Sequence, residues 1–139
     1  MCAGRSTPDP VVVVAAVIED GSRFLVTRRQ AGVHLEGLWE FPGGKIDKHE
    51  THAEALRREI REELDADVEV GDLVLATTHV YPEKTVTLRF YRCRLVGTPR
   101  PLLGQEMRWV SRTELSTLGF PAADEALILL LSQTRASPA

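Results

Sequence analysis

Residues 51–64 most strongly limit the possible folds of this chain, because a helical repeat here interrupts a series of strand-like segments. Thr51 can act as the N-cap of the helix, and Glu54 three residues later completes a capping box. At about 100° per residue one sector of the helix is apolar. Its members are Ala53, Leu56, Ile60 and Leu64. We therefore predict a helix that packs along this stripe against a sheet.

The segments on both sides of this helix have strand patterns. Residues 11–18 are apolar on both faces, as in a central strand, and 23–29 return as the second strand of a hairpin. Further expected elements are strands 39–41, 67–79, 85–95 and 107–110, a helical turn at 113–115 and a buried helix at 124–132. Pro42, Gly43 and Gly44 should end strand 39–41 in a sharp turn. This order predicts an α+β or mixed α/β fold with helices on both faces of the sheet.

The length of 139 residues allows one domain, which we place at 10–133 between flexible ends at 1–9 and 134–139. The net charge of −3 argues against polymeric nucleic acid or an anionic membrane as partner, but it permits a small anionic ligand. We expect no membrane span and no signal peptide. The two cysteines form no CxxC pair, so we expect a cytoplasmic protein.

Three carboxylates crowd the predicted helix beside its apolar stripe. Glu59 and Glu63 are i,i+4 neighbours, and Glu59 and Glu62 are i,i+3 neighbours, so their charges repel one another. Two interpretations remain open. Either the helix has a solvated face on which nearby arginines screen the acids, or a divalent cation neutralises them. Oxygen ligands without a paired cysteine or histidine favour Mg²⁺ or Mn²⁺ over Zn²⁺.

The wider spacing adds a motif. Gly44 is followed after five residues by Glu50, and after seven more by the run Arg58-Glu59-Ile60-Arg61-Glu62-Glu63-Leu64. This pattern resembles the Nudix box, GX5EX7REUXEEXGU, in which U is aliphatic. A random match is on the order of one in a million for such a chain. Asp65 replaces the final glycine of the box, and we expect altered helix capping rather than lost chemistry.

Other segments resemble the MutT-type branch of the Nudix hydrolases, so that the resemblance covers roughly residues 11–131. They are TRR (27–29), EFPGGKI (40–46), YPEKTVTL (81–88), GQEMRWV (104–110) and FPAADE (120–125). The resemblance implies an α/β/α sandwich with a central mixed β-sheet. It also implies hydrolysis of a nucleoside diphosphate linked to another group, by water that a metal activates.

Several residues receive roles from this resemblance. Glu59, Glu62 and Glu63 would ligate the metal together with the backbone carbonyl of Gly43, and one of the glutamates would act as the base. Arg58 would hold a glutamate of the box in place, and Glu50 would support it. Lys45 would neutralise phosphate or the leaving group, or it is a solvated loop lysine. MutT-like proteins often carry one more metal-associated glutamate where this chain has Leu103, so either Glu106 replaces it or the ligand is missing.

The substrate-binding residues implied by position are Arg29, Phe41, Lys84, Phe120 and Asp124. Phe41 and Phe120 either stack on a base or belong to the core. Asp124 stands where enzymes that select 8-oxoguanine nucleotides commonly have asparagine. An ionised aspartate only accepts hydrogen bonds, which suits the donors of cytosine or guanine, but it could instead cap the last helix.

The predicted activity is therefore Mg²⁺-dependent hydrolysis of a nucleoside triphosphate to the monophosphate and pyrophosphate. Oxidised dGTP and cytidine-type or modified dCTP nucleotides are the candidate substrates. Two alternatives remain, a hydrolase of nucleotide sugars or dinucleoside polyphosphates and a catalytically silent nucleotide-binding module. The sequence does not fix the oligomeric state.

Overall fold

A computed structural model describes residues 10–33 and 35–133 of the chain. The segments 1–9 and 134–139, expected to be flexible, lie outside the described residues, and the single domain over 10–133 stays a prediction. The strands are β1 (Val11–Asp20), β2 (Arg23–Arg28), β3 (Trp39–Glu40), β4 (Gly43–Lys45), β5 (Asp67–Val80), β6 (Thr85–Val96) and β7 (Met107–Ser111). The helices are α1 (His52–Leu64), α2 (Arg112–Leu115) and α3 (Glu125–Gln133), preceded by the 3₁₀ turn Ala122–Asp124.

The sheet is mixed, and β1 lies at its centre. Its strand order is β3-β2-β1-β6-β5, with β4 paired to β1 and β7 paired to β2. β1 runs parallel to β6 over Val11–Ile18, whereas the other pairings are antiparallel. The predicted β1–β2 hairpin is confirmed. Only the two residue pairs next to its turn are paired, because the rest of β2 pairs with β3 and β7.

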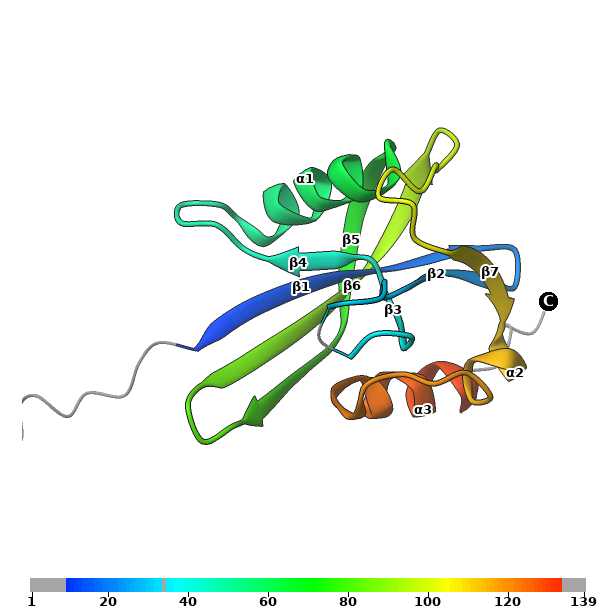
Figure 1. Ribbon diagram of the computed structural model, residues 1–139. Coiled ribbons are helices and arrows are strands. Elements are labelled where there is room, and N and C mark those ends of the chain that lie inside the picture. The colour runs from blue at the N-terminus through cyan, green and yellow to red at the C-terminus, as the bar shows by residue number, and fades with distance from the viewer. Residues whose placement is uncertain (1–9, 34, 134–139) are drawn as a thin grey trace, which may run out of the picture.

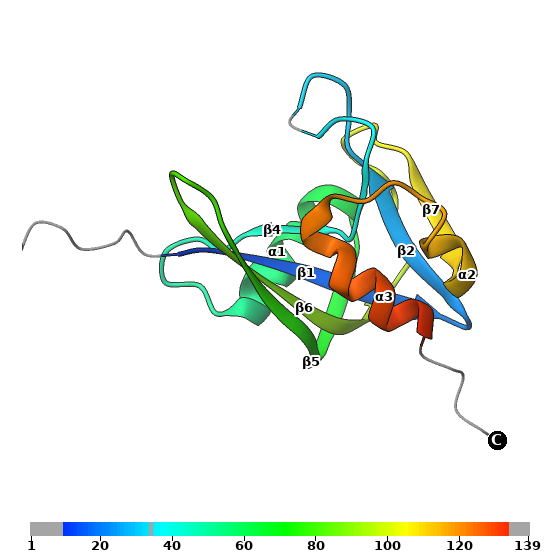
Figure 2. The ribbon, with the colours of Figure 1, turned by 90° about the horizontal axis from the view of Figure 1, so that it is seen from below.

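Helices cover both faces of this sheet, as the sequence predicts. Figure 1 shows α1 on one side and α3 on the other, and Figure 2 shows α3 lying across the opposite face from α1. Alternate residues of β1 serve the two layers. Val14, Ala16 and Ile18 pack under α1, while Ala15 and Val17 pack toward α3. The all-apolar run of β1 is thus explained by burial on both sides.

The local structure of α1 follows its sequence. The capping box between Thr51 and Glu54 is present in both directions. Asp65 ends the helix in the left-handed conformation, with φ 52°, which confirms that aspartate can take the place of the expected glycine. The apolar stripe differs at one position, because Ala55 is fully buried and Ala53 only partly so.

The expected sharp turn at Gly43 and Gly44 is wrong. These residues form the extended strand β4, which pairs with Val13–Ala15 of β1, and neither glycine has a positive φ. Their lack of a side chain is needed for close packing instead. A Cβ on Gly43 would lie 2.7 Å from Cα of Ala15, and one on Gly44 would lie 2.5 Å from Cδ of Glu59. β4 therefore lies directly against both the central strand and the carboxylate helix.

Candidate active site

Arg58 of α1 connects the acidic residues of the site. Its Nε donates to Glu50 at 2.7 Å and its Nη2 donates to the other carboxylate oxygen at 3.0 Å, so this pair is bidentate. Nη1 donates to Glu59 at 3.1 Å and to Glu62 at 3.3 Å. Nη2 also donates to the backbone carbonyl of Lys45 at 3.1 Å, which links the helix to β4. A planar guanidinium can satisfy all these acceptors at once.

Glu59 and Glu63 form the most enclosed part of the acidic group. The Glu59 side chain is 16% exposed and lies against the backbone of Gly44. Its carboxyl is hydrogen-bonded to that of Glu63. Two negative charges this close together repel each other, so a cation between the two carboxyls would stabilise the pair.

Burial is the main reason why the pKa of Glu63 rises to about 9. The hydrogen bond with Glu59 and the charges of Glu59 and Glu40 act in the same direction, while a hydrogen bond from the Gly43 backbone opposes them. Glu50, which is bound to Arg58, has the opposite shift. The Arg58 hydrogen bond holds the pKa of the half-buried Glu50 carboxyl below its usual value.

Glu62 does not join this pair. Its side chain is 59% exposed and its carboxylate is paired with Arg58. Among residues 10–33 and 35–133, no group of three His, Cys, Asp or Glu side chains is arranged to hold a metal ion. The expected crowding of all three glutamates is thus found only for Glu59 and Glu63. Hard oxygen donors in a partly buried pair still fit a small divalent cation, because the cation would offset the repulsion between the two carboxyl groups.

Glu40 is a member of this network that the sequence analysis did not single out. It lies on β3, its carboxylate accepts from Arg29 at 2.9 Å, and burial raises its pKa despite the arginine. Its charge raises the pKa values of both Glu63 and Asp124. Glu40 therefore lies between the carboxylate helix and the start of α3. Its position between Trp39 and Phe41 in an extended segment was the available signal, since alternation places it on the opposite face from both.

Asp124 is 8% exposed in the 3₁₀ turn before α3. Burial, followed by the charge of Glu40, raises its pKa to about 7. No hydrogen bond from its side chain to another described residue is present, so the alternative role as a helix cap is not found. Asp124 is therefore a buried carboxyl close enough to Glu40 for the two charges to interact.

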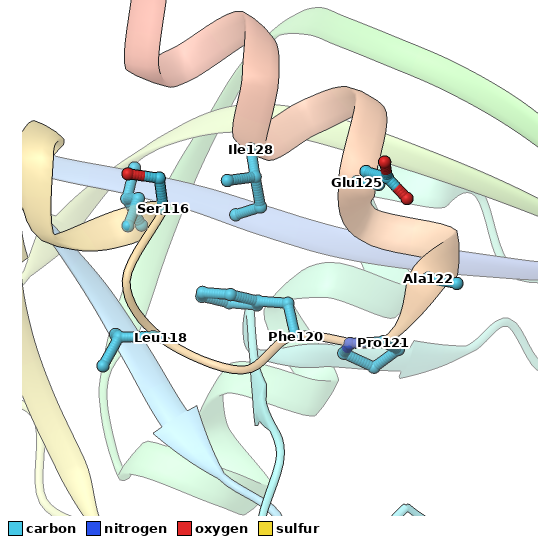
Figure 3. A pocket seen from close by; sticks show the side chains of 8 residues that line it. Ser116, Leu118, Phe120, Pro121, Ala122, Glu125 and Ile128 are labelled. Atoms are coloured by element: carbon cyan, nitrogen blue, oxygen red, sulfur yellow. The ribbon is translucent and has the colours of Figure 1, made fainter.

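The two phenylalanines stack on each other at a centroid distance of 5.5 Å. Phe41 is 4% exposed and also meets Phe90 edge-on, so it belongs to the core. Phe120 is half-buried and lines a pocket of about 220 Å³ between α2, the 116–121 loop and α3. Figure 3 shows the Phe120 ring in this pocket, between the side chains of Leu118 and Ile128. The pocket lies on the α3 face of the sheet, away from α1.

The remaining predicted residues, Lys45, Lys84 and Glu106, have no side-chain contact with Glu59 or Glu63 among the contacts of the described residues. Lys45 is an exposed residue of β4, and Lys84 is exposed in the turn that joins β5 to β6. Glu106 pairs with Arg28 at 3.3 Å and Arg108 at 3.5 Å. The carboxylate of Glu106 is thus engaged by two cations, and the neighbouring Leu103 is 56% exposed.

Residues 13–130 match the family model described as NUDIX domain. The chain belongs to the Nudix hydrolase family. It is similar to the putative 8-oxo-dGTP diphosphatase 2 of Mycobacterium tuberculosis, with 39% identity over 88% of this chain and 89% of that protein. It is 34% identical to the CTP pyrophosphohydrolase of Escherichia coli, over 86% and 88% of the two chains.

The fold of this Nudix chain matches a solved relative closely. The solution structure of the E. coli ORF135 protein superposes with a TM-score of 0.79 and 31% identity, covering 93% of this chain and 96% of that one. The α/β/α sandwich predicted from the sequence is therefore confirmed. Nudix hydrolases generally need a divalent metal. In the described part of this Nudix chain, no helix is both long and apolar enough to cross a membrane.

Proposed function

We propose that this Nudix hydrolase cleaves a nucleoside triphosphate to the monophosphate and pyrophosphate with Mg²⁺, for which Mn²⁺ can substitute. The observation that carries the proposal is the partly buried pair of Glu59 and Glu63, with the Glu59 carboxyl packed against Gly44. Burial disfavours the charged form of Glu63, and a bound divalent cation would favour that charged form. The names of the relatives, a diphosphatase and a pyrophosphohydrolase, support the same reaction class.

Glu59 and Glu63 would hold the cation, with the Gly43 carbonyl and Glu62 as further ligands. Glu62 reaches the site only by leaving Arg58, and its exposed position leaves it free to do so. When bound, the cation neutralises phosphate charge and lowers the pKa of water. Arg58 then keeps Glu50 and Glu59 in place through its hydrogen bonds. One of the glutamates accepts the proton of the attacking water.

The phosphate chain of the substrate would extend along β4, where the exposed Lys45 offers a cation for the phosphates or the pyrophosphate leaving group. The nucleoside would lie toward the start of α3. There Asp124 supplies a hydrogen-bond acceptor and Arg29 is held near it by Glu40. Phe120 would contact the base, supported from the core by Phe41, and Lys84 would approach from the β5–β6 turn.

Asp124 is the residue that would select the base of the substrate. When ionised, the Asp124 carboxylate would accept hydrogen bonds from the amino group of cytosine or from N1–H and N2–H of guanine. Oxidised dGTP and cytidine-type nucleotides are therefore the two substrates to compare, consistent with the names of both relatives. The buried free Cys93 fits an enzyme of the reducing cytoplasm acting on small nucleotides.

The test is a panel of nucleoside triphosphates, nucleotide sugars and dinucleoside polyphosphates, with products separated by chromatography. We expect pyrophosphate rather than orthophosphate from a triphosphate, and only with Mg²⁺ or Mn²⁺ present. Glu62→Gln and Glu63→Gln should abolish turnover while the proteins stay folded. Glu69→Gln, at an exposed surface pair with Arg94, is the matched control. Tight nucleotide binding without turnover would instead favour a silent binding module.

A further inference from the structure

The last turn of α1, which carries Glu63, is held by a neighbouring segment rather than by its own helix. Helix carbonyls in the final turn have no partner within the helix and need donors from elsewhere. The backbone N–H of Leu102 donates to the Glu63 carbonyl at 3.0 Å, and the N–H of Arg100 donates to the Leu64 carbonyl at 2.7 Å. The Arg100 side chain also pairs with Asp65, the C-cap residue.

Gln105 is the side chain that completes this attachment. Its Nε2 donates to the Glu63 carbonyl at 3.1 Å, and its Oε1 accepts from the Leu103 backbone N–H at 2.9 Å. Gln105 is 8% exposed, one of the few buried polar residues in the described chain. The amide nitrogen of Gln105 thus binds the last turn of α1, and its amide oxygen binds the 100–105 segment that packs against that turn. A second glutamine, Gln30, fixes the same segment from outside by donating to the Leu103 carbonyl at 2.6 Å.

The carbonyl that this attachment holds and the carboxyl of the acidic site belong to the same residue, Glu63. That carboxyl lies beside Glu59 and the Gly43 backbone, both of which affect its pKa. A shift or rotation of the last turn would therefore displace the carboxyl from Glu59. Gln105 lies behind the site, and its amide is occupied by protein groups, so it needs no contact with substrate to have this effect.

We propose that Gln105 is a positioning residue, which fixes the last turn of α1 so that the Glu63 carboxyl can share a divalent cation with Glu59. The proposal rests on the proposed function only in taking Glu63 as a metal ligand. Groups that hold metal ligands in place typically change metal affinity or activity by about 10- to 100-fold when they are removed. Loss of the Gln105 amide should weaken the site by a factor in this range.

Two substitutions test the hydrogen-bond donor and the hydrogen-bond acceptor of the Gln105 amide. Gln105→Met keeps the length and volume of the side chain but removes both hydrogen bonds. Gln105→Glu still accepts from Leu103 N–H but no longer donates to Glu63, and it places a negative charge against that carbonyl. Leu102→Ala is the control, because it changes an exposed side chain of the same segment and keeps the backbone donor to Glu63.

Mn²⁺ binding to each protein is measured by titration calorimetry and by electron paramagnetic resonance, and kcat and KM are measured with the best triphosphate. We expect both Gln105 variants to bind Mn²⁺ about tenfold or more weakly than wild type. At saturating Mn²⁺, kcat should fall while KM changes less than twofold, and Leu102→Ala should match wild type throughout. The melting temperature identifies any variant that fails to fold. If one of the two Gln105 variants is unfolded, the other is used for the test.

The proposal is overturned if folded Gln105→Glu binds Mn²⁺ like wild type, or if KM and stability change while Mn²⁺ affinity and kcat do not. Failure of the proposed function has a different signature. In that case the wild-type protein itself neither binds Mn²⁺ at Glu63 nor releases pyrophosphate.

Discussion

A methyl group added at Gly44 should damage catalysis far more than folding. The new Cβ would lie 2.5 Å from Cδ of Glu59, whereas carbon atoms in contact prefer about 3.5–4.0 Å. The Glu59 carboxyl must therefore retreat by about 1 Å. A 1 Å misplacement of a catalytic group can cost about 100-fold in rate. Because the obstructing atoms belong to the end of a flexible side chain, the helix and β4 need not separate.

The matched comparison is Gly43→Ala on the same short strand. There the added Cβ would meet backbone atoms of β1, including Cα of Ala15 at 2.7 Å, and backbone cannot rotate away. We expect this variant to lose at least about 1–3 kcal/mol of unfolding free energy, the usual cost of overpacking. Gly44→Ala should stay near wild type in urea denaturation while its kcat falls about 100-fold.

A double-mutant cycle assigns the Gly44 effect to Glu59. In a Glu59→Ala background no carboxyl remains to be displaced, so Gly44→Ala should cause almost no further loss of activity. If Gly44→Ala retains wild-type kcat, or if its loss adds fully to that of Glu59→Ala, the close packing of β4 on Glu59 is not what places the carboxyl.

Two further predictions concern stability. Arg112 donates to Glu19 and to the Leu131 carbonyl, both at 2.8 Å, and lies over the Phe24 ring. Arg112→Met should therefore lower the free energy of unfolding by about 1–3 kcal/mol, because buried or half-buried acceptors lose their donor, and it should leave kcat unchanged. A loss below about 0.5 kcal/mol, the range of ordinary surface substitutions, would contradict this prediction. The raised pKa of Asp124, about 7, means that the unfolded chain gives up this proton first as pH rises. The native state thus loses stability between the unfolded pKa near 4 and pH 7, by on the order of a few kcal/mol, and Asp124→Asn should flatten this decline in urea denaturation at pH 5 and pH 8. Parallel decline of both proteins would refute the assignment.

The sequence was sufficient where local rules agree with the tertiary structure. The capping box at Thr51, the left-handed Asp65 and the doubly apolar β1 all follow from short-range patterns that the fold preserves. It failed at Gly43 and Gly44, because a Pro-Gly-Gly segment normally indicates a turn. The requirement for glycine arises here from contacts with β1 and Glu59 that are distant in sequence.

The site was predictable in its residue types but not in its arrangement. Helical spacing correctly places Glu59 and Glu63 side by side, but it cannot show that Glu62 turns to Arg58 instead. Glu40 and Gln105 were missed because each acts through partners on other elements, Glu40 through Arg29 and Gln105 through the Glu63 carbonyl. Such contacts depend on how β3 and the 100–105 segment pack against other elements, and the periodicity of the sequence does not predict that packing.

The occupancy of the Glu59–Glu63 pair by a divalent cation is the central claim, and a crystal grown with Mn²⁺ and a non-hydrolysable triphosphate tests it most directly. We expect an anomalous peak between the two carboxyls, with oxygen ligands at about 2.1 Å and the triphosphate on the same ion. An ion bound elsewhere, with no density between the Glu59 and Glu63 carboxyls, would contradict this claim.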